Sequence, residues 1–330
     1  MTITKKFKQV LYHLFTFATK KFFMPFSLSK KLLLFFVASL IFLACNSNRQ
    51  NSGTGSDSAA AQNNYAPADT TVDTAKKETV IPPVDSTVKI TMPNPVDTFT
   101  TDTSKKYVFL TFDDGPQGGT MNVYHNLKAL GLKGTFFMVG LHATYGKEMR
   151  NAVDTIRDAY PQILLANHSY THANDKYIEF YHNVRSCFDD FMQAQQSLGV
   201  QKKFIRLPGN AAWVLATGML AHPLVKPVCN LLDSAGYTVI GWDVEWSFKR
   251  DPSGHGSVPV QTPETMVKMV ENALNNHRTH RRNAVVLLSH DRMFNHSNYS
   301  DSLYKFMQIL KQRNPNYVFE TVDHYPGSRS

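Results

Sequence analysis

The residues with the clearest chemical potential are two neighbouring carboxylates, Asp113 and Asp114, in the segment Thr-Phe-Asp-Asp-Gly-Pro (111–116). Adjacent carboxylates repel each other unless a cation or another positive charge lies nearby. Gly115 and Pro116 turn the chain directly afterwards. Because turns are rich in Asp and Gly, this pair alone does not indicate a catalytic or metal site. Other polar residues must accompany it.

Two histidines are the first polar residues that could act together with the carboxylates. His168 and His172, in His-Ser-Tyr-Thr-His, are four residues apart, which places both side chains on one face if the turn is helical and is a spacing that zinc sites often use. Two neutral imidazoles and one carboxylate make a three-ligand site with positions left for water and substrate. The alternative is a surface loop in a chain with 13 His. The two pairs together favour a divalent metal site.

Two further ionisable residues could complete a catalytic site. His290, in Leu-Leu-Ser-His-Asp (287–291), ends an apolar run and can exchange protons near neutral pH. Arg206, in Arg-Leu-Pro-Gly-Asn, is a cation suited to keep a nearby carboxylate ionised. A turn-capping role for His290 is the simpler alternative.

The elements that must position these residues alternate between strand and helix. Helical stretches are predicted at 120–130, 145–159, 177–198, 224–235, 263–276 and 301–313. Short apolar runs, typical of strands buried on both faces, lie at 107–112, 135–139, 163–166, 204–207, 238–241, 284–289 and 317–321. Repeated units of this kind predict a parallel sheet covered by helices.

The polar residues follow five of these strands, which favours a closed or nearly closed barrel over an open sheet. In a parallel β/α barrel every strand ends on the same face, where sites are built. The residues concerned are Asp113, Asp114, His168, Arg206, Asp243, Glu245 and His290. The predicted fold is an α/β, distorted (β/α) barrel of about seven parallel strands. The apolar stretch 210–231 is expected to form a lid or groove wall, or a helical pair covering the barrel.

In order and spacing, the motifs of residues 105–323 resemble the NodB homology domain, the polysaccharide deacetylases of carbohydrate esterase family 4. The matching motifs are Thr-Phe-Asp-Asp-Gly-Pro, His-Ser-x-x-His, Arg-x-Pro and Leu-Ser-His. The family's fold is a distorted (β/α) barrel. The resemblance implies metal-assisted hydrolysis of an N-acetyl group, with the metal polarising the carbonyl.

The resemblance also implies a role for each matching residue. Asp113 would be the general base and His290 the general acid, while Arg206 would orient Asp113. The metal, usually zinc and with cobalt or nickel as alternatives, would be held by Asp114, His168 and His172. A backbone N–H would help to bind the oxyanion, and Gly209 is the candidate donor.

Two segments depart from the family pattern. Gly209-Asn210 stands where the family has an aromatic residue and then Gly, which leaves the shape of the sugar subsite open. The family's Asp-x-x-Asp-Trp becomes Trp-Asp-Val-Glu-Trp (242–246). Either Asp243 or Glu245 could be the partner of Arg206. Trp242 or Trp246 could stack on a sugar, although at least one is expected in the core.

The N-terminal part of the chain is predicted to be an export leader followed by a tether. Residues 1–44 contain seven lysines and no acid, and without them the formal charge of +9 falls to +2, so a nucleic-acid partner is not expected. A basic segment, a short apolar run and Ala44-Cys45 resemble a lipoprotein leader (1–45), with translation starting at Met1 or Met24. Ordinary cleavage near Ala44 is the alternative.

Composition defines the remaining organisation. The chain has 330 residues, and 42% of them are hydrophobic. This composition excludes the collagen-like, coiled-coil and wholly disordered classes of protein. Residues 46–104, rich in Asn, Ser, Thr, Asp and Pro, are predicted to be a disordered linker, and residues 105–330 the catalytic domain. Cys187 and Cys229 could form a disulfide outside the cytoplasm or remain separate thiols.

The expected function is that of a bacterial envelope enzyme, anchored to a membrane, which acts on an acetylated polysaccharide. The leading hypothesis is N-deacetylation of N-acetylglucosamine polymers, with peptidoglycan placed before chitin-like glycans. An O-acetyl esterase acting on xylan or another glycan is the alternative, because both reactions pass through an oxyanion. A glycan-binding pseudoenzyme ranks lower, since base, ligands and acid are all present.

Overall fold

The computed structural model describes residues 102–252, 254 and 256–329, which form an α/β domain around a ten-stranded, mostly parallel sheet. The predicted leader (1–45) with Cys45, and residues 46–101 of the predicted linker, lie outside the described residues. In the described part, no helix has the length and apolarity needed to cross a bilayer.

The sheet is built around its longest strand, β1 (Lys106–Asp113), which pairs in parallel with three other strands. The order across the sheet is β6-β5-β7-β4-β3-β2-β1-β11-β8, with β12 also beside β1. The remaining parallel strands are β2 (Gly134–Met138), β3 (Ile163–Asn167), β4 (Phe204–Ile205), β7 (Thr238–Val239), β8 (Val244–Glu245), β11 (Ala284–His290) and β12 (Tyr317–Phe319). The predicted α/β fold with a distorted, barrel-like parallel sheet is therefore confirmed.

Every predicted strand is present, and one further parallel strand, β8, was missed. Its two residues are too short to give a hydrophobic pattern, and it exists because Val244 and Glu245 pair with Leu287 and Leu288 of β11. In the order of pairing, β8 and the β6 hairpin strand stand at opposite ends of the sheet.

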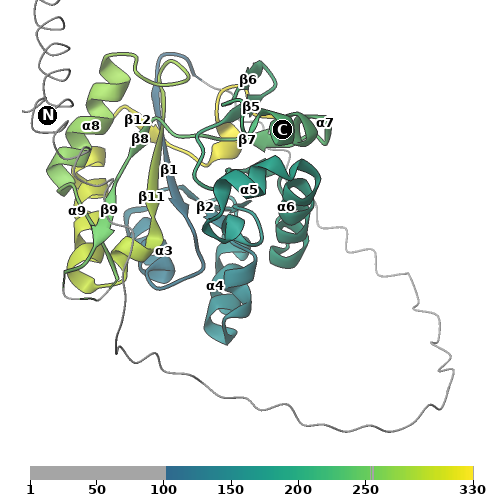
Figure 1. Ribbon diagram of the computed structural model, residues 1–330. Coiled ribbons are helices and arrows are strands. Elements are labelled where there is room, and N and C mark those ends of the chain that lie inside the picture. The colour runs from purple at the N-terminus through teal and green to yellow at the C-terminus, as the bar shows by residue number, and fades with distance from the viewer. Residues whose placement is uncertain (1–101, 253, 255, 330) are drawn as a thin grey trace, which may run out of the picture. The chain divides into compact units, whose positions relative to one another are not determined.

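The helices lie around the outside of the strands (Figure 1). They are α3 (Thr120–Leu130), α4 (Lys147–Asp158), α5 (Tyr177–His182), α6 (Val184–Leu198), α7 (Lys226–Ser234), α8 (Pro263–Asn275) and α9 (Ser297–Arg313). The single helix predicted over 177–198 is two helices, which meet at Asn183.

The two faces of β1 pack against different cores. Val108, Leu110 and Phe112 belong to a cluster shared with α3, α8 and α9. Tyr107 and Phe109 face a second cluster, which includes Phe137, Val286 and Tyr325. Side chains alternate across a strand, so the face of Tyr107 and Phe109 is also the face of Thr111 and Asp113. This places the first carboxylate above an apolar core.

Segment 210–231 is not the helical pair considered above. It forms an antiparallel hairpin, β5 (Trp213–Leu215) with β6 (Gly218–Leu220), and then α7 begins at Lys226. Trp213, Val214 and Leu215 are buried, and Val214 pairs with Val239 of β7. The apolar residues therefore extend the sheet. A second hairpin, β9 (Phe248–Arg250) with β10 (Ser257–Pro259), follows β8.

The disulfide left open by the sequence does not form: Cys187 of α6 and Cys229 of α7 are both free and buried. They belong to one apolar cluster between α6, α7 and the sheet. Burial raises the pKa of the Cys229 thiol to about 12 and that of Cys187 further still.

We predict that neither thiol reacts with a thiol reagent in the native protein, because both are enclosed and protonated. In a Cys45→Ser chain, Ellman titration should detect no fast-reacting thiol before denaturation and two after it. Failure to detect any thiol in denaturant without reductant would show that the two cysteines are joined instead.

Candidate active site

The predicted polar residues meet in one pocket at the carboxyl ends of the strands. Asp113 of β1 and His290 of β11 occupy paired register positions on neighbouring strands. Asp114 directly follows β1, and His168 directly follows β3. The pocket has a volume of about 730 Å³, and all four residues, together with His172, line it. The sequence prediction that these residues share one rim agrees with this arrangement.

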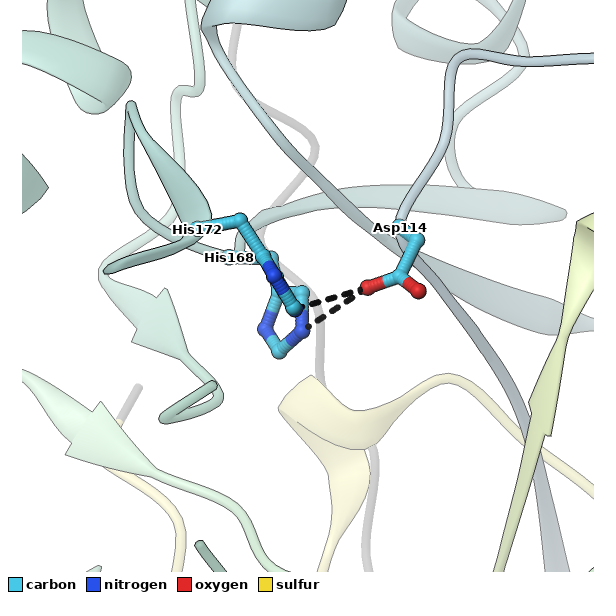
Figure 2. Close-up of side chains that lie close together, drawn as sticks. All are labelled: Asp114, His168 and His172. Atoms are coloured by element: carbon cyan, nitrogen blue, oxygen red, sulfur yellow. Dashed lines mark ion pairs between the residues drawn. The ribbon is translucent and has the colours of Figure 1, made fainter. Parts of the chain in front are cut away.

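Asp114, His168 and His172 point toward one another and form a candidate metal site (Figure 2). Nε2 of His168 lies 3.4 Å from Oδ1 of Asp114, and Nε2 of His172 lies 3.0 Å from the same oxygen. One ligand atom from each residue falls within 4.8 Å of the others. Oδ1 of Asp114 is buried without a hydrogen-bond partner among the described residues, so the donor set fits a divalent cation.

The electrostatics of this cluster also favour a bound cation. Burial would raise the pKa of Asp114, but the close contacts with the His168 and His172 imidazoles hold it well below its usual range. Burial acts to lower the pKa of His168, yet the negative charges of Asp113 and Asp114 prevail and raise it. Positive charge is therefore favoured between these carboxylates, and a metal ion can replace the protons.

The orientation of His168 is fixed by a backbone group of another strand end. Its Nδ1 lies 2.9 Å from the carbonyl oxygen of Arg206. Because a carbonyl oxygen can only accept, Nδ1 carries a proton, and Nε2 is the nitrogen that faces Asp114 and is available to bind a metal ion.

The second histidine begins an unusual left-handed turn, residues 172–175. His172, Ala173, Asn174 and Asp175 all have φ between 47° and 59°. The left-handed conformation costs non-glycine residues roughly 1–2 kcal/mol each. Such strain persists only where surrounding contacts over-determine it, and it clusters at functional sites. One such contact is the His172 N–H, which donates to Oγ of Ser169 at 3.0 Å.

Arg206 is completely buried, and its side chain connects β1 with the residues that follow β7. Its Nη1 donates to Asp113 Oδ1 at 2.8 Å and to Thr111 Oγ1 at 2.6 Å. Its Nε and Nη2 donate to the carbonyl oxygens of Ile240 and Gly241. The second oxygen of Asp113 is thereby directed to the metal cluster, 3.6 Å from Nε2 of His168.

His290 lines the pocket beside Oδ2 of Asp114, whereas the two metal-site histidines contact Oδ1. Its Nε2 is 3.9 Å from Oδ2 of Asp114, and the ring of Phe248 meets its ring edge-on with centroids 4.8 Å apart. Its Nδ1 is buried without a hydrogen-bond partner among the described residues. Burial lowers the pKa of His290, as expected for an imidazole enclosed by apolar walls.

The two acids that could have paired with Arg206 lie elsewhere. Asp243 accepts hydrogen bonds from the backbone N–H groups of His280 and Val286, at 2.6 and 2.8 Å, and interacts with Arg206 only through space. Burial raises the pKa of Asp243 to about 6. Glu245 lines the pocket. The carboxylate that Arg206 contacts directly is Asp113, at the end of β1.

The two tryptophans have different environments. Trp246 is fully buried against Phe294 and Phe306, so it is the core residue that the sequence analysis expected. Trp242 is half-buried and lines the pocket, where it could face a sugar. Gly209 also lines the pocket, with φ of 64°, and a Cβ there would lie 3.2 Å from the Tyr177 ring.

Sequence reasoning missed the two residues that follow His290. Arg292 forms an ion pair with Oδ2 of Asp114 and lies over the Phe248 ring. Asp291 is fully buried, and its carboxyl group is bonded to Thr120 and to Gln117, the latter at 2.8 Å. The only signal in the sequence was their position next to His290: Asp291 ends the segment Leu-Leu-Ser-His-Asp, but no role was assigned to it.

Asp291 holds the turn that follows Asp114. A Cβ on Gly119, whose φ is 98°, would lie 2.0 Å from the Asp291 carbonyl oxygen, so only glycine allows this approach. The first-turn residue Thr120 then reaches the Asp291 carboxyl group. Burial raises the pKa of this carboxyl from 3.8 to about 8.

Replacing Arg206 should test whether the buried ion pair organises the domain. We expect Arg206→Met to lower the free energy of unfolding by about 3–5 kcal/mol, because the Asp113 charge stays buried without its partner. Urea denaturation would measure this. Arg185→Met is the control: Arg185 pairs with Asp189 at the surface, its side chain is 79% exposed, and the change should be within about 0.5 kcal/mol. Equal effects of the two substitutions would contradict the assignment.

A pH experiment should reveal the buried carboxyl of Asp291. The folded protein retains this proton up to about pH 8, whereas the unfolded chain releases it near pH 3.8. The free energy of unfolding contributed by this group therefore falls as pH rises between those values. Asp291→Asn, a neutral mimic of the protonated acid, should lose this fall when urea unfolding is compared at pH 5 and pH 8. Identical pH dependence in both proteins would argue against a protonated Asp291.

Comparison with known proteins shows which family and which relatives this chain resembles. The family model described as polysaccharide deacetylase matches residues 100–214. A chitin disaccharide deacetylase of Vibrio alginolyticus is 24% identical over 311 residues, which cover 68% of this chain and 72% of that protein.

Two solved structures are also similar. A family 4 carbohydrate esterase from Streptomyces lividans has a TM-score of 0.46 and 23% identity, over 68% of this chain and 97% of that one. The catalytic domain of a peptidoglycan N-acetylglucosamine deacetylase from Eubacterium rectale has a TM-score of 0.49 and 22% identity, over 72% and 98%. The resemblance that the motifs indicated is confirmed by the family match over residues 100–214, and the similarity to a deacetylase indicates that this chain is a hydrolase.

Proposed function

We propose that this protein is a divalent-metal-dependent enzyme that hydrolyses N-acetyl groups of N-acetylglucosamine-containing polysaccharide, with peptidoglycan as the first candidate and chitin-like glycan as the second. The observation that carries the proposal is the gathering of Asp113, the Asp114–His168–His172 cluster and His290 around one pocket. The names of the similar proteins support the choice of an N-acetylated glycan.

Three side chains would hold the cation: Asp114 through Oδ1, and His168 and His172 through Nε2. Zinc is the proposed ion because two imidazoles and one carboxylate suit its preferred coordination, and cobalt or nickel are alternatives. A bound ion of this kind would polarise the acetyl carbonyl and make a water molecule more acidic.

Asp113 would act as the general base. Arg206 fixes one of its oxygens, and the other is directed to the metal cluster, so the carboxylate is held in place to remove a proton from water. The oxygen of that water bonds to the acetyl carbon. The oxyanion that results needs hydrogen-bond donors, and the backbone N–H of Gly209, which lines the pocket, is the proposed one.

His290 would complete the reaction as the general acid. It lines the same pocket on the Oδ2 side of Asp114, where it would donate a proton to the sugar nitrogen as the carbon–nitrogen bond breaks. The products are acetate and a free amine on the sugar. The apolar wall provided by Phe248 limits water around the imidazole and thereby strengthens its interactions with charges in the site.

The pocket rim suits a carbohydrate. Aromatic side chains offer flat apolar faces with polar edges, and four of them line the pocket: Tyr145, Tyr177, Trp242 and Phe248. The Tyr145 side chain is 65% exposed, so it can meet a sugar outside the pocket. A glycan chain could therefore pass over the site with one residue inserted.

We also propose that the enzyme works at the bacterial cell envelope. The support is in the sequence: a leader over 1–45 ending at Cys45, the proposed lipidation site, and a polar linker over 46–104 that would tether the catalytic domain, 105–330. Proximity to the cell wall is the reason for placing peptidoglycan first.

The proposal predicts that zinc-loaded protein releases acetate from N-acetylglucosamine oligomers or peptidoglycan, and that Asp113→Asn lowers the rate about 10²- to 10⁴-fold because the base is lost. Acetate would be measured enzymatically, before and after removal of metal with a chelator and after its return. Asp154→Asn, a surface change on α4, serves as the matched control.

Acetylated xylan would be assayed in parallel. Release from xylan alone would replace the N-deacetylase assignment with an O-acetyl esterase. Absence of release from every substrate by zinc-loaded protein would favour a glycan-binding protein without turnover.

A further inference from the structure

The geometry points to Asp190 of α6 as a positioning residue that holds Tyr170 and Thr171, between the two metal-site histidines and directly before the left-handed turn 172–175. We propose that its carboxylate fixes the place of His172 relative to His168, and so sets the affinity and geometry of the metal site. This inference rests on the proposed metal-dependent function, and no motif includes Asp190.

The contacts are specific and come from outside the turn. Oδ1 of Asp190 accepts the backbone N–H groups of Tyr170, at 2.7 Å, and Thr171, at 3.3 Å. Oδ2 accepts the Thr171 hydroxyl group at 2.8 Å. Both oxygens of one carboxylate are thus used on the two residues that directly precede His172.

The same helix also holds the end of β3, directly before His168, through hydrogen bonds. Asn167, fully buried at the end of β3, donates from Nδ2 to the Phe191 carbonyl oxygen at 2.8 Å and to Oε1 of Gln195 at 2.9 Å. Its Oδ1 accepts the Ser169 N–H at 2.9 Å. Helix α6 therefore holds the residues beside both histidines, through Asn167 on one side and Asp190 on the other.

The turn needs an external restraint because its own conformation is unfavourable. Residues 172–175 are all left-handed, with φ of 47° to 59°, and none is glycine. Hydrogen bonds such as that from the Asn174 N–H to the Thr171 carbonyl link the turn only to neighbouring residues of the same segment. Asp190 links Tyr170 and Thr171, directly before the turn, to a helix packed on the sheet, and the N–H groups of residues 140 and 141 hold the carbonyls of residues 169 and 170 from the other side. Without the link to Asp190 the chain could relax toward right-handed conformations and carry the His172 imidazole away from Asp114.

The neighbouring residue supplies a matched control. Asp189 lies on the exposed side of α6, where it pairs with Arg185 at 3.0 Å and its side chain is 53% exposed. Asp189→Ala removes the same chemical group from the same helix without touching the turn.

The first experiment measures zinc affinity of the full-length protein by competition with a chromophoric chelator. Partners that orient metal ligands typically contribute 10- to 100-fold to affinity, so Asp190→Ala should weaken zinc binding by about that factor, whereas Asp189→Ala should leave it unchanged. Asp190→Asn keeps an acceptor for the two N–H groups and a donor for Thr171, so it should restore most of the affinity. In the cobalt-loaded protein, only Asp190→Ala should alter the visible absorption spectrum, which reports ligand geometry.

The second experiment uses metal-free protein, so its outcome does not depend on the proposed function. Amide hydrogen exchange of segment 168–176 should be faster in Asp190→Ala than in the wild type or in Asp189→Ala. If Asp190→Ala does not fold, Thr171→Val, which removes only the hydroxyl contact, should shift zinc affinity and exchange in the same direction by a smaller factor.

The possible outcomes separate the two proposals. Zinc affinity and exchange that match those of the Asp189 control would overturn the role of Asp190. A wild-type protein that binds no zinc would instead refute the proposed metal dependence, and the exchange comparison would then decide alone whether Asp190 holds the turn.

Discussion

The interaction on which the site depends is the buried contact between Arg206 and Asp113. A fully enclosed guanidinium group and carboxylate are costly to desolvate, and the cost is offset only when every polar atom finds a partner. Arg206 meets this requirement through Asp113, Thr111 and the carbonyl oxygens that follow β7. Its own carbonyl oxygen accepts a hydrogen bond from Nδ1 of His168. One residue therefore places both the proposed base and a metal ligand.

Around this pair, each component of the site is held by a different element. Asp291 accepts hydrogen bonds from the turn after Asp114. Arg292 pairs with Oδ2 of Asp114, while the metal-site histidines contact Oδ1. On the opposite side, α6 holds the segment between His168 and His172 through Asn167 and Asp190. Strand ends converge in a parallel sheet, so residues distant in sequence can be restrained within a few ångströms.

Much of this arrangement was predictable from the sequence, for reasons that particular residues illustrate. The apolar runs behind Asp113, His168 and His290 are strands whose side chains are buried on both faces, and such runs have a clear pattern. Strand β8 and the β5–β6 hairpin were missed because they are two or three residues long and exist only through pairing with distant strands. The break at Asn183, which starts α6 and so places Asp190, was also missed.

The chemistry could be predicted from the amino-acid sequence: carboxylates, imidazoles and a guanidinium group stand at the ends of strands, in an order that resembles the polysaccharide deacetylases. These features are local, because residue type, spacing and hydrophobic pattern can be read along the chain. Which groups meet depends on the three-dimensional fold. It directs Arg206 to Asp113, buries Trp246 but leaves Trp242 in the pocket, and brings Arg292 to Asp114. Such pairings depend on side-chain direction and on contacts across more than 90 residues, as between Asp113 and Arg206, which no local pattern encodes.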